Sequence, residues 1–368
     1  AWRGHSDTES LLAGFEAWGV VETLKRAIGM FAIALWDRAE RTLTLARDRI
    51  GEKPLYWGVG REGAALLFGS ELKALRAHPQ FNPALNHEAV ALYLRFGYVP
   101  APRTIYQHVH KLQPGTVATW RSPQQPPQIT EYWSAMQAML DGHAQPLAID
   151  ATESVERLDA LLRSAVSQQM MADVPLGAFL SGGIDSSTVV ALMQAQSTRP
   201  IQTFSIGFHE EGYDEAQHAK AVARHLGTDH TELYVTAQQA LDVVPQLPQM
   251  YDEPIADSSQ IPTHLVSRLA RRHVTVALSG DAGDELFCGY GRYIRTQEIW
   301  NRLRRIPAPV RRATGGLLQA VPISTWAGVG TAIGRIWPTR RRMNRLGEKL
   351  HKGAEALSGA NSDAIYIN

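Results

Sequence analysis

Residues 180–187 read Leu180-Ser181-Gly182-Gly183-Ile184-Asp185-Ser186-Ser187 and join an apolar, strand-like run at 176–180 to a helical segment at 186–196. Two adjacent glycines allow a tight turn in which backbone N–H groups come close to a ligand. Serine hydroxyls add further donors, and the following helix points its positive end at the same loop. The stretch therefore predicts a cradle for phosphate oxygens, although a Gly-Gly turn with serine caps also fits the pattern.

Asp185 is the one acidic side chain in this loop. A carboxylate would repel bare phosphate, so its presence predicts a bridging Mg²⁺ with oxygen ligands. Gly-Lys-Ser/Thr does not follow the glycines, which excludes a Walker A loop. The loop instead resembles the pyrophosphate loop of enzymes that cleave ATP between the α and β phosphates and form an adenylated intermediate.

A second polar loop follows the apolar run at 274–278 and carries three acidic groups, Asp281, Asp284 and Glu285. At the carboxyl end of a parallel strand, close to the first loop, these groups would supply a second magnesium carboxylate and line an acceptor pocket. A calcium-like acidic turn or a solvated helix cap is the alternative.

Strand-like and helical runs alternate around the first loop, with strands expected at 202–207 and 231–235 and helices at 152–171 and 214–226. This rhythm predicts βαβ units and a parallel sheet. Upstream, a helix at about 7–18 precedes short strand-like runs that predict an antiparallel region, at 30–36, 42–46, 55–57 and 65–68. The polar, proline-rich stretch 121–127 separates the antiparallel region from the region of alternating strands and helices, so we expect a linker there.

The 368 residues include 37 basic and 36 acidic side chains, and 44% are hydrophobic. This composition excludes collagen-like and disordered classes, and the length predicts two domains. Apolar runs are too short for a membrane-spanning helix. The lone cysteine, Cys288, excludes an internal disulfide framework and favours a reducing cytosol. The capped start near Ala1 and the apolar end at 363–368 predict a fragment cut at both ends.

The basic residues are unevenly distributed, since residues 301–345 hold ten arginines and no acidic side chain. Such a stretch is typical of a nucleic-acid or anionic-lipid patch, or of a solvated basic surface on helices. Aromatic residues do not interleave with the arginines in a nucleic-acid motif, so we favour the solvated surface. The rest of the chain is acidic on balance.

Five segments of the second half, in order, resemble the glutamine-hydrolysing asparagine synthetase family: 181–187, 203–208, 225–230, 252–259 and 279–285. Four segments of the first half resemble the end of that family's glutaminase domain: 6–9, 29–32, 46–56 and 97–102. The resemblance is specific over roughly the first 290 residues and thin beyond them.

The resemblance implies a partial glutamine amidotransferase domain over residues 1–133, with the antiparallel sheets of an N-terminal-nucleophile fold. Residues 134–368 would form a truncated, doubly wound parallel-sheet domain of the ATP-pyrophosphatase type. The implied enzyme is a cytoplasmic ligase that uses ATP and Mg²⁺ to amidate aspartate to asparagine through β-aspartyl-AMP, with ammonia from glutamine. Its partners would be these small substrates, neither membrane nor nucleic acid, and a homodimer stays open.

The resemblance also assigns roles residue by residue. Asp281 would promote formation of β-aspartyl-AMP, and Asp7 would hold the ammonium group of glutamine, although Asp7 also suits the first turn of a helix. Asp185 and Asp284 would hold Mg²⁺. ATP and its pyrophosphate would contact Leu180, Ser181, Gly182, Gly183, Asp185, Ser186, Ile206, Ser279 and Gly280.

Three departures and several alternatives accompany this interpretation. The family's glutaminase nucleophile is an amino-terminal cysteine, whereas this chain starts with Ala1. Cys288, expected to be a buried small side chain, stands where the family usually has glycine and cannot replace that nucleophile. Ala282 also stands where the family usually has glycine, which narrows backbone freedom in the acidic turn. The family's downstream lysine that contacts phosphate is not identifiable in the basic stretch. Another carboxylate acceptor, such as a sugar acid or a β-lactam precursor, a tRNA-modifying enzyme and a non-catalytic remnant remain alternatives.

Other polar residues carry weaker signals. His218, His225 and His230 suggest a metal site, but surface histidines fit their spacing better. The Asp252-Glu253 pair and Asp257 could touch aspartate or magnesium, and local loop capping is the alternative for Asp257.

Overall fold

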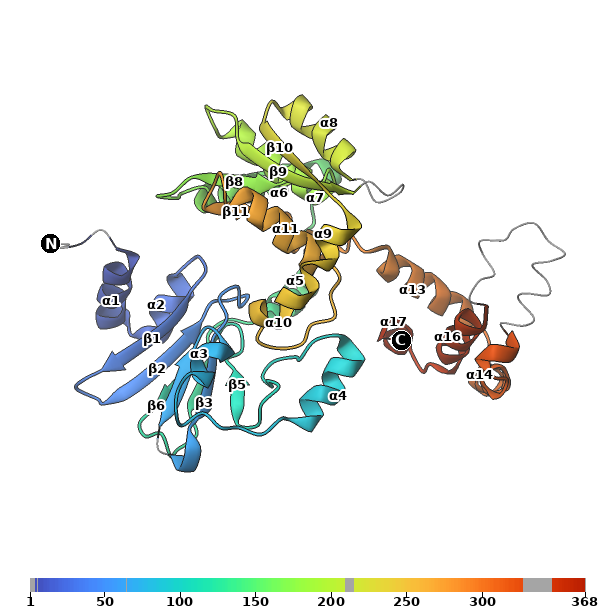
Figure 1. Cartoon of the computed structure of the whole chain (residues 1–368), viewed down its shortest axis with the longest axis horizontal. Helices are drawn as coiled ribbons and strands as arrows, with labels where there is room; N and C mark the ends of the chain where they lie inside the picture. The colour runs from blue at the N-terminus through green and yellow to red at the C-terminus, as the bar shows by residue number, and fades with distance from the viewer. Residues whose placement is uncertain (1–3, 5, 64, 209–214, 327–345, 368) are drawn as a thin grey trace.

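The computed structural model describes residues 4, 6–63, 65–208, 215–326 and 346–367. Figure 1 shows an amino-terminal part with antiparallel strands, a second part built on parallel strands, and carboxyl-terminal helices that extend to one side. This mixed architecture agrees with the predicted order of an antiparallel region followed by a parallel sheet.

Two antiparallel sheets form the first domain. The larger sheet has the order β1-β2-β6-β7, with β1 at Ala32–Asp37, β2 at Thr42–Arg47, β6 at Thr116–Trp120 and β7 at Gln128–Glu131. The smaller sheet has the order β4-β3-β5, with β4 at Leu66–Gly69, β3 at Tyr56–Val59 and β5 at Val109–Lys111. A 3-10 turn at Arg61–Gly63 joins β3 and β4.

Successive side chains of a strand point to opposite faces of its sheet, and this alternation arranges the domain in layers. Leu45 points into a cluster with Leu55 and Trp120 that fills the space between the sheets. Its neighbour Ala46 points to the opposite face, toward Leu24 of the helical pair α1 (Asp7–Trp18) and α2 (Val20–Arg26). The smaller sheet is covered on its outer face by α3 (Leu72–Arg76), and α4 (His87–Phe96) follows at the edge of the domain.

Two side chains of the family-like segment 46–56 stabilise a turn between the sheets. The Asp48 carboxylate is buried and accepts hydrogen bonds from four backbone N–H groups, those of Phe31, Gly51, Glu52 and Lys53. Arg47 donates to the carbonyls of Gly51, Lys53 and Leu112, and burial lowers the pKa of its guanidinium. Together these side chains fix the turn that leads from one sheet to the other.

The second domain contains a four-stranded parallel sheet of order β10-β9-β8-β11. Its strands are β8 (Leu176–Phe179), β9 (Gln202–Phe208), β10 (Asp229–Val235) and β11 (Val276–Leu278). The chain steps outward from β8 to β9 and β10, then returns to the other side of β8 to form β11. The strand order therefore reverses between β8 and β11, the place where ligands bind in sheets of this kind.

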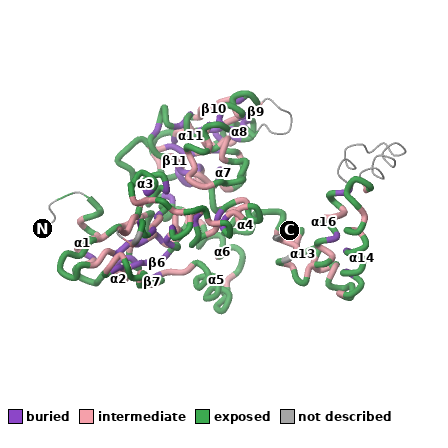
Figure 2. The backbone as a smooth tube through the Cα atoms, turned by 60° about the horizontal axis from the view of Figure 1, so that its bottom comes forward, coloured by how far each residue is buried: buried purple, intermediate pink, exposed green. Residues whose placement is uncertain are grey.

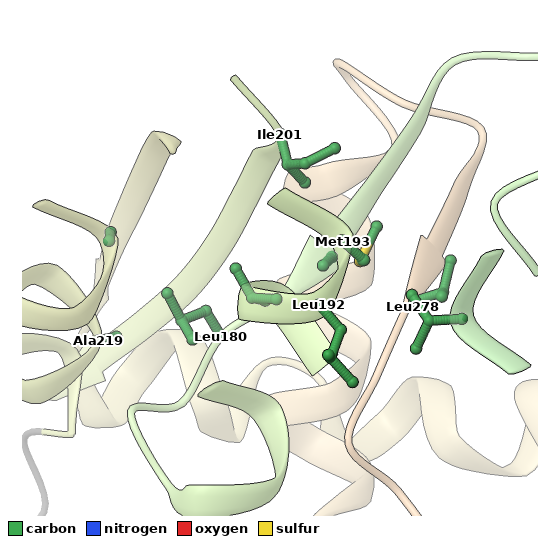
Figure 3. Packing of buried hydrophobic residues seen from close by; sticks show 10 residues of the cluster. Leu180, Leu192, Met193, Ile201, Ala219 and Leu278 are labelled. Carbon is green, nitrogen blue, oxygen red and sulfur yellow. The ribbon is translucent and has the colours of Figure 1, made fainter. Parts of the chain in front are cut away.

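Helices cover both faces of this sheet. On one face α6 (Ala151–Gln169), α7 (Ile184–Ala195) and α8 (Ala216–Leu226) enclose a cluster that includes Leu180, Leu192, Met193, Ile201, Ala219 and Leu278 (Figure 3). On the other face α11 (Gln260–Ala270) packs against Phe179 and Phe204. The segment between β10 and α11 contains α9 (Ala237–Leu241), a 3-10 turn at Val244–Gln246 and α10 (Leu247–Met250).

The proline-rich stretch 121–127 is not a linker between domains, and that expectation was wrong. It connects β6 and β7, which pair as neighbouring antiparallel strands of the first domain. The prolines exclude a helix or central strand there, as the sequence indicates, but a hairpin loop satisfies the same restriction. The exposed helix α5 (Ala135–Ala144) follows β7 and leads toward the second domain.

The carboxyl-terminal helices lie apart from both sheets in Figures 1 and 2: α13 (Gly291–Leu303), α14 (Ala308–Ala320), α16 (Leu346–Ser358) and α17 (Ser362–Ile367). Of the five arginines of the basic stretch that are described, Arg302, Arg304, Arg305 and Arg312 are exposed. Arg311 is buried and donates to the carbonyls of Ile306, Leu357 and Gly359. Residues 327–345, with the other arginines, lie outside the described residues.

None of the helices in the described ranges combines the length and the apolar character that crossing a membrane requires.

Candidate functional site

The loops that follow β8 and β11 touch each other. A Cβ atom placed on Gly280 would lie 2.6 Å from the backbone N of Ser186, and one placed on Gly283 would lie 2.5 Å from Cγ of Asp185. The two segments that the sequence singled out are therefore in direct contact at the reversal of the strand order. Glycine at 280 and 283 is what allows this approach.

The first loop is organised by its own serines. Ser186 is buried, and its hydroxyl lies 2.9 Å from the Ser181 hydroxyl and accepts from the Ser181 N–H. The Ser181 hydroxyl in turn accepts from the N–H of Gly183, the N-cap residue of α7. These bonds hold the loop in a tight turn with Gly182 in the left-handed region, at φ +81°.

Three helix amino termini converge on this turn. Helix α7 begins at Ile184, and within the described chain no side chain caps its first N–H groups. A Cβ on Gly182 would lie 2.7 Å from the backbone N of Ala219, so the first turn of α8 packs directly against the loop. The short helix α12 (Gly283–Phe287) starts beside Asp185. The uncapped first N–H groups of α7 and the helix dipoles at one place favour an anion of high charge.

Asp281, Asp284 and Glu285 have different surroundings in the second loop. Asp281 accepts from the Ser279 hydroxyl at 2.9 Å, and Asp284 lies in the first turn of α12. Glu285 accepts from the Tyr290 hydroxyl at 2.6 Å, and this bond lowers the pKa of its carboxyl. Asp281 and Glu285 thus each have a local hydrogen-bond partner.

Both ends of α12 adopt left-handed backbone without glycine. Ala282, the N-cap, has φ +74°, and Cys288, the C-cap, has φ +56°. These are the two positions where the family resemblance calls for glycine. Ala282, where the resemblance implies narrowed backbone freedom, has positive φ. The expectation that Cys288 is buried was wrong, because it is a free and exposed cysteine.

We expect Ala282→Gly to stabilise the chain by about 1 kcal/mol, because glycine removes the penalty of an L-residue in the left-handed region. The urea midpoint of unfolding measures the change. Ala138→Gly, on the exposed face of α5, is the matched control and should destabilise by a similar amount. A loss of stability in Ala282→Gly would contradict the assigned strain.

The residues present fit Mg²⁺ bound together with a phosphate ligand. Mg²⁺ takes one or two carboxylates and completes its shell with waters and substrate phosphates. Asp185 and Asp284 lie on the facing loops, and the Asp185 carboxylate occupies the space that only a glycine at 283 leaves open. In the described part of the chain, three or more His, Cys, Asp or Glu side chains do not gather into a metal-binding group.

The predicted site residues do not all gather at this place. Ser181, Gly182, Gly183, Asp185 and Ser186 lie on the first loop, and Ser279, Gly280, Asp281 and Asp284 on the second. Leu180 is 1% exposed in the core and its N–H donates to the Phe204 carbonyl, so its own carbonyl is the polar group left for a ligand. Ile206 on β9 packs toward Val235. Asp7 is exposed in the first turn of α1, in the other domain.

Asp252 and Glu253 face the first domain instead of the loops. The Asp252 carboxylate accepts from the Leu72 N–H at 2.5 Å, and the Glu253 carboxylate accepts from the Ile105 N–H at 2.7 Å. Asp257 accepts from the N–H and hydroxyl of Ser259, which hold its pKa below the usual range. The capping alternative for Asp257 therefore describes its place in the structure.

Two of the three histidines are exposed, as expected, but His230 is not. Its ring lies 2.9 Å from the Thr203 hydroxyl and 3.2 Å from the Ser205 hydroxyl. Burial lowers the pKa of His230, so the neutral ring is favoured. The sequence did not single out His218 as a neighbour of the loop, yet its Cβ lies against Gly182 in the first turn of α8.

A cavity of about 670 Å³ lies elsewhere, in the first domain, between Trp57, His110, Trp120 and the 123–127 turn. It is remote in the chain from both loops, and the indole N–H of Trp120, one of its lining residues, is buried with no hydrogen-bond partner in the described part of the chain. We therefore place the candidate site at the loops, where the convergent polar groups are.

Comparisons with known proteins identify a family for each part of the chain. A family model described as asparagine synthase matches residues 157–365, and one described as glutamine amidotransferase domain matches residues 1–133. The first of these includes both loops.

Individual relatives carry the same description. A Mycobacterium bovis protein named "Putative asparagine synthetase [glutamine-hydrolyzing]" is 38% identical over 320 residues, 86% of this chain and 48% of that protein. A Bacillus subtilis protein named asparagine synthetase [glutamine-hydrolyzing] 1 is 34% identical over 308 residues, 83% of this chain and 46% of that protein. Asparagine synthetase B [glutamine-hydrolyzing] of Escherichia coli is 30% identical over 302 residues, 77% of this chain and 47% of that protein.

The chain spans about half the length of the curated relatives it matches. Two glycine-bearing loops in contact at the strand-order reversal, and a family model that covers more than half of the chain, lead to the same assignment. The chain belongs to the asparagine synthase family.

Proposed function

We propose that the second domain binds ATP with Mg²⁺ and activates the β-carboxylate of aspartate as β-aspartyl-AMP, which ammonia converts to asparagine. The observation that carries this proposal is the contact between the two loops beside three helix amino termini. Such a place suits a polyphosphate and brings a second, acidic loop to its edge. The names of the relatives support aspartate over a sugar acid or a β-lactam precursor as the acceptor.

The proposed chemistry has two steps. A carboxylate oxygen of aspartate attacks the α-phosphorus, and the bond to the β-phosphate oxygen breaks, so pyrophosphate leaves. Ammonia then attacks the activated carbonyl carbon, a proton is lost, and AMP leaves. Bound Mg²⁺ would neutralise charge on the phosphates.

The residues take the following parts in this proposal. Backbone N–H groups and hydroxyls of the first loop hold pyrophosphate, namely those of Ser181, Gly182, Gly183 and Ser186. Asp185 and Asp284 hold the metal ion. The nucleotide contacts Leu180 through its backbone, together with Ile206, Ser279 and Gly280. Asp281, held by the Ser279 hydroxyl, lies where the adenylate forms. Positioning and preorganised electrostatics supply the catalysis.

In an intact enzyme that carries the family's amino-terminal cysteine, the first domain would supply the ammonia. Its two packed antiparallel sheets with helices on both outer faces support an N-terminal-nucleophile type of glutamine amidotransferase. Asp7 would hold the ammonium group of glutamine there. The second domain, with helices on both faces of its parallel sheet, supports the doubly wound ATP-pyrophosphatase type, and we place the boundary at residues 133 and 134.

The test is a product assay with free ammonium, which does not depend on glutamine hydrolysis. The chain, Mg²⁺, ATP, aspartate and ammonium chloride should yield pyrophosphate and AMP in equal amounts. Omission of aspartate should abolish pyrophosphate release, and a sugar acid should not replace it. Release of ADP and phosphate, or pyrophosphate release that ignores aspartate, would refute the proposal.

A further inference from the structure

We infer that the Asp252-Glu253 turn of the second domain is a lock that holds the two domains in one fixed arrangement, with Lys111 and the amino end of α3 as its counterpart. The inference rests on the proposed function in one respect: two domains that exchange ammonia need a constant separation. Its structural part stands on the contacts alone.

Each carboxylate of the turn contacts two groups, and both groups belong to the first domain. Glu253 Oε1 accepts from the Ile105 N–H at 2.7 Å, and its Oε2 lies 2.5 Å from Lys111 Nζ. Asp252 Oδ2 accepts from the Leu72 N–H at 2.5 Å, and its Oδ1 lies 3.8 Å from Lys73 Nζ. One backbone N–H and one lysine of the first domain thus lie against the oxygens of each group, so both carboxylates are directed at the first domain.

The bond to Leu72 completes a helix across the interface. Helix α3 begins at Leu72, and its N-cap residue, Glu71, makes no side-chain capping bond in the described chain. Asp252 supplies the missing cap from the other domain, where a negative group also favours the helix dipole. The first domain therefore depends on the second for a local element of its own fold.

The ion pair at the centre of the lock is removed from water. The side chains of Lys111 and Glu253 are 16% and 11% exposed, and Lys111 also donates to the Val99 carbonyl. Burial, with Glu253 and Asp252 nearby, raises the pKa of Tyr56 on β3 to about 12. Loss of one partner of such a pair leaves an unpaired charge in the interface, whereas loss of both costs far less. The pair therefore specifies the docking geometry more than it adds stability.

The contacts continue along the chain on both sides of the turn. The Ala256 N–H donates to the Gly97 carbonyl at 2.7 Å, and Lys73 donates to the carbonyl of Gln249 at the end of α10. Helix α11 starts four residues after Ala256 and leads to β11 and the acidic loop. The lock thus anchors the first domain to the element that precedes the candidate site, and Lys111 and Glu253 act as positioning residues.

Hydrogen exchange of the whole chain tests the lock at three amides that it should protect, those of Leu72, Ile105 and Ala256. We expect Lys111→Met to raise exchange at all three by roughly tenfold or more, because the unpaired Glu253 carboxylate opens the interface. Lys111→Arg keeps the charge and should restore protection. Lys111→Met combined with Glu253→Gln should exchange more slowly than Lys111→Met alone.

Glu88→Gln is the matched control, because the Glu88–Arg103 pair is exposed and lies within the first domain. It should leave the three amides unchanged. A change confined to Ile105 in the lock variants, or equal effects in the single and double variants, would overturn the inference. Ammonium-dependent pyrophosphate release is measured on the same samples: its absence from the unmodified chain refutes the proposed function, and the exchange result still decides the lock.

Discussion

Replacing Asp185 with asparagine is expected to lower the rate of pyrophosphate release by roughly 10²–10³-fold, the usual cost of one preorganised electrostatic group. Asparagine has the same size, so the packing of this side chain against Gly283 is kept. What changes is the charge in the first turn of α7, where phosphate and Mg²⁺ are proposed to meet. The measurement is a steady-state pyrophosphate assay with saturating ATP, aspartate and ammonium.

The sign of the effect on ATP affinity separates a metal ligand from a structural carboxylate. With Mg²⁺ present, Asp185→Asn should bind ATP more weakly, because a ligand is lost. With Mg²⁺ removed by a chelator, the same variant should bind ATP more tightly than the unmodified chain, since an anion no longer faces the phosphates. Thr188→Val, one turn along the same helix and exposed, is the control and should change neither affinity. An affinity change of the same sign in both conditions would contradict the metal role.

The sequence allowed the site to be predicted because its signals are local. Strand, glycine pair and helix follow one another over about twenty residues, and the parallel strand rhythm implied that loops after neighbouring strands meet at one edge of the sheet. The contact of Gly283 with Asp185 confirms that expectation. The positive φ of Ala282 was also foreseeable, because the resemblance implied glycine at that position.

The errors concern residues whose partners are distant in the chain. From the sequence, Asp252 and Glu253 could touch aspartate or magnesium, yet their partners Leu72 and Lys111 lie more than 140 residues away in the chain. His230 read as a surface residue because the hydroxyls beside it come from another strand, β9. The 121–127 stretch was expected to be a linker because its prolines exclude a helix or a central strand. The same prolines do not distinguish a loop between domains from a loop between two strands of one sheet.

Replacing Gly182 with alanine should destabilise the second domain and abolish nucleotide binding, whereas Gly227→Ala should do little more than strain one residue. The two glycines share left-handed backbone, with φ +81° and +71°. They differ in their surroundings: a Cβ on Gly182 would lie 2.7 Å from the backbone of Ala219, but on Gly227 it would have no heavy atom of the described chain within 4 Å. The pair therefore separates the cost of backbone strain from the cost of a clash.

We expect Gly227→Ala to cost about 1 kcal/mol of unfolding free energy, the penalty for an L-residue at positive φ. Gly182→Ala has the same penalty, and its methyl group must also push α8 away from the loop. The total loss of unfolding free energy should therefore be roughly 2–5 kcal/mol. Because the amino end of α8 is one of three that face the proposed phosphate site, its displacement should also weaken ATP binding beyond detection, while Gly227→Ala keeps the affinity within about twofold. Urea unfolding followed by circular dichroism and titration calorimetry with Mg²⁺ and ATP measure the two quantities. Equal losses in the two variants would mean that the contact between the loop and α8 does not hold the site.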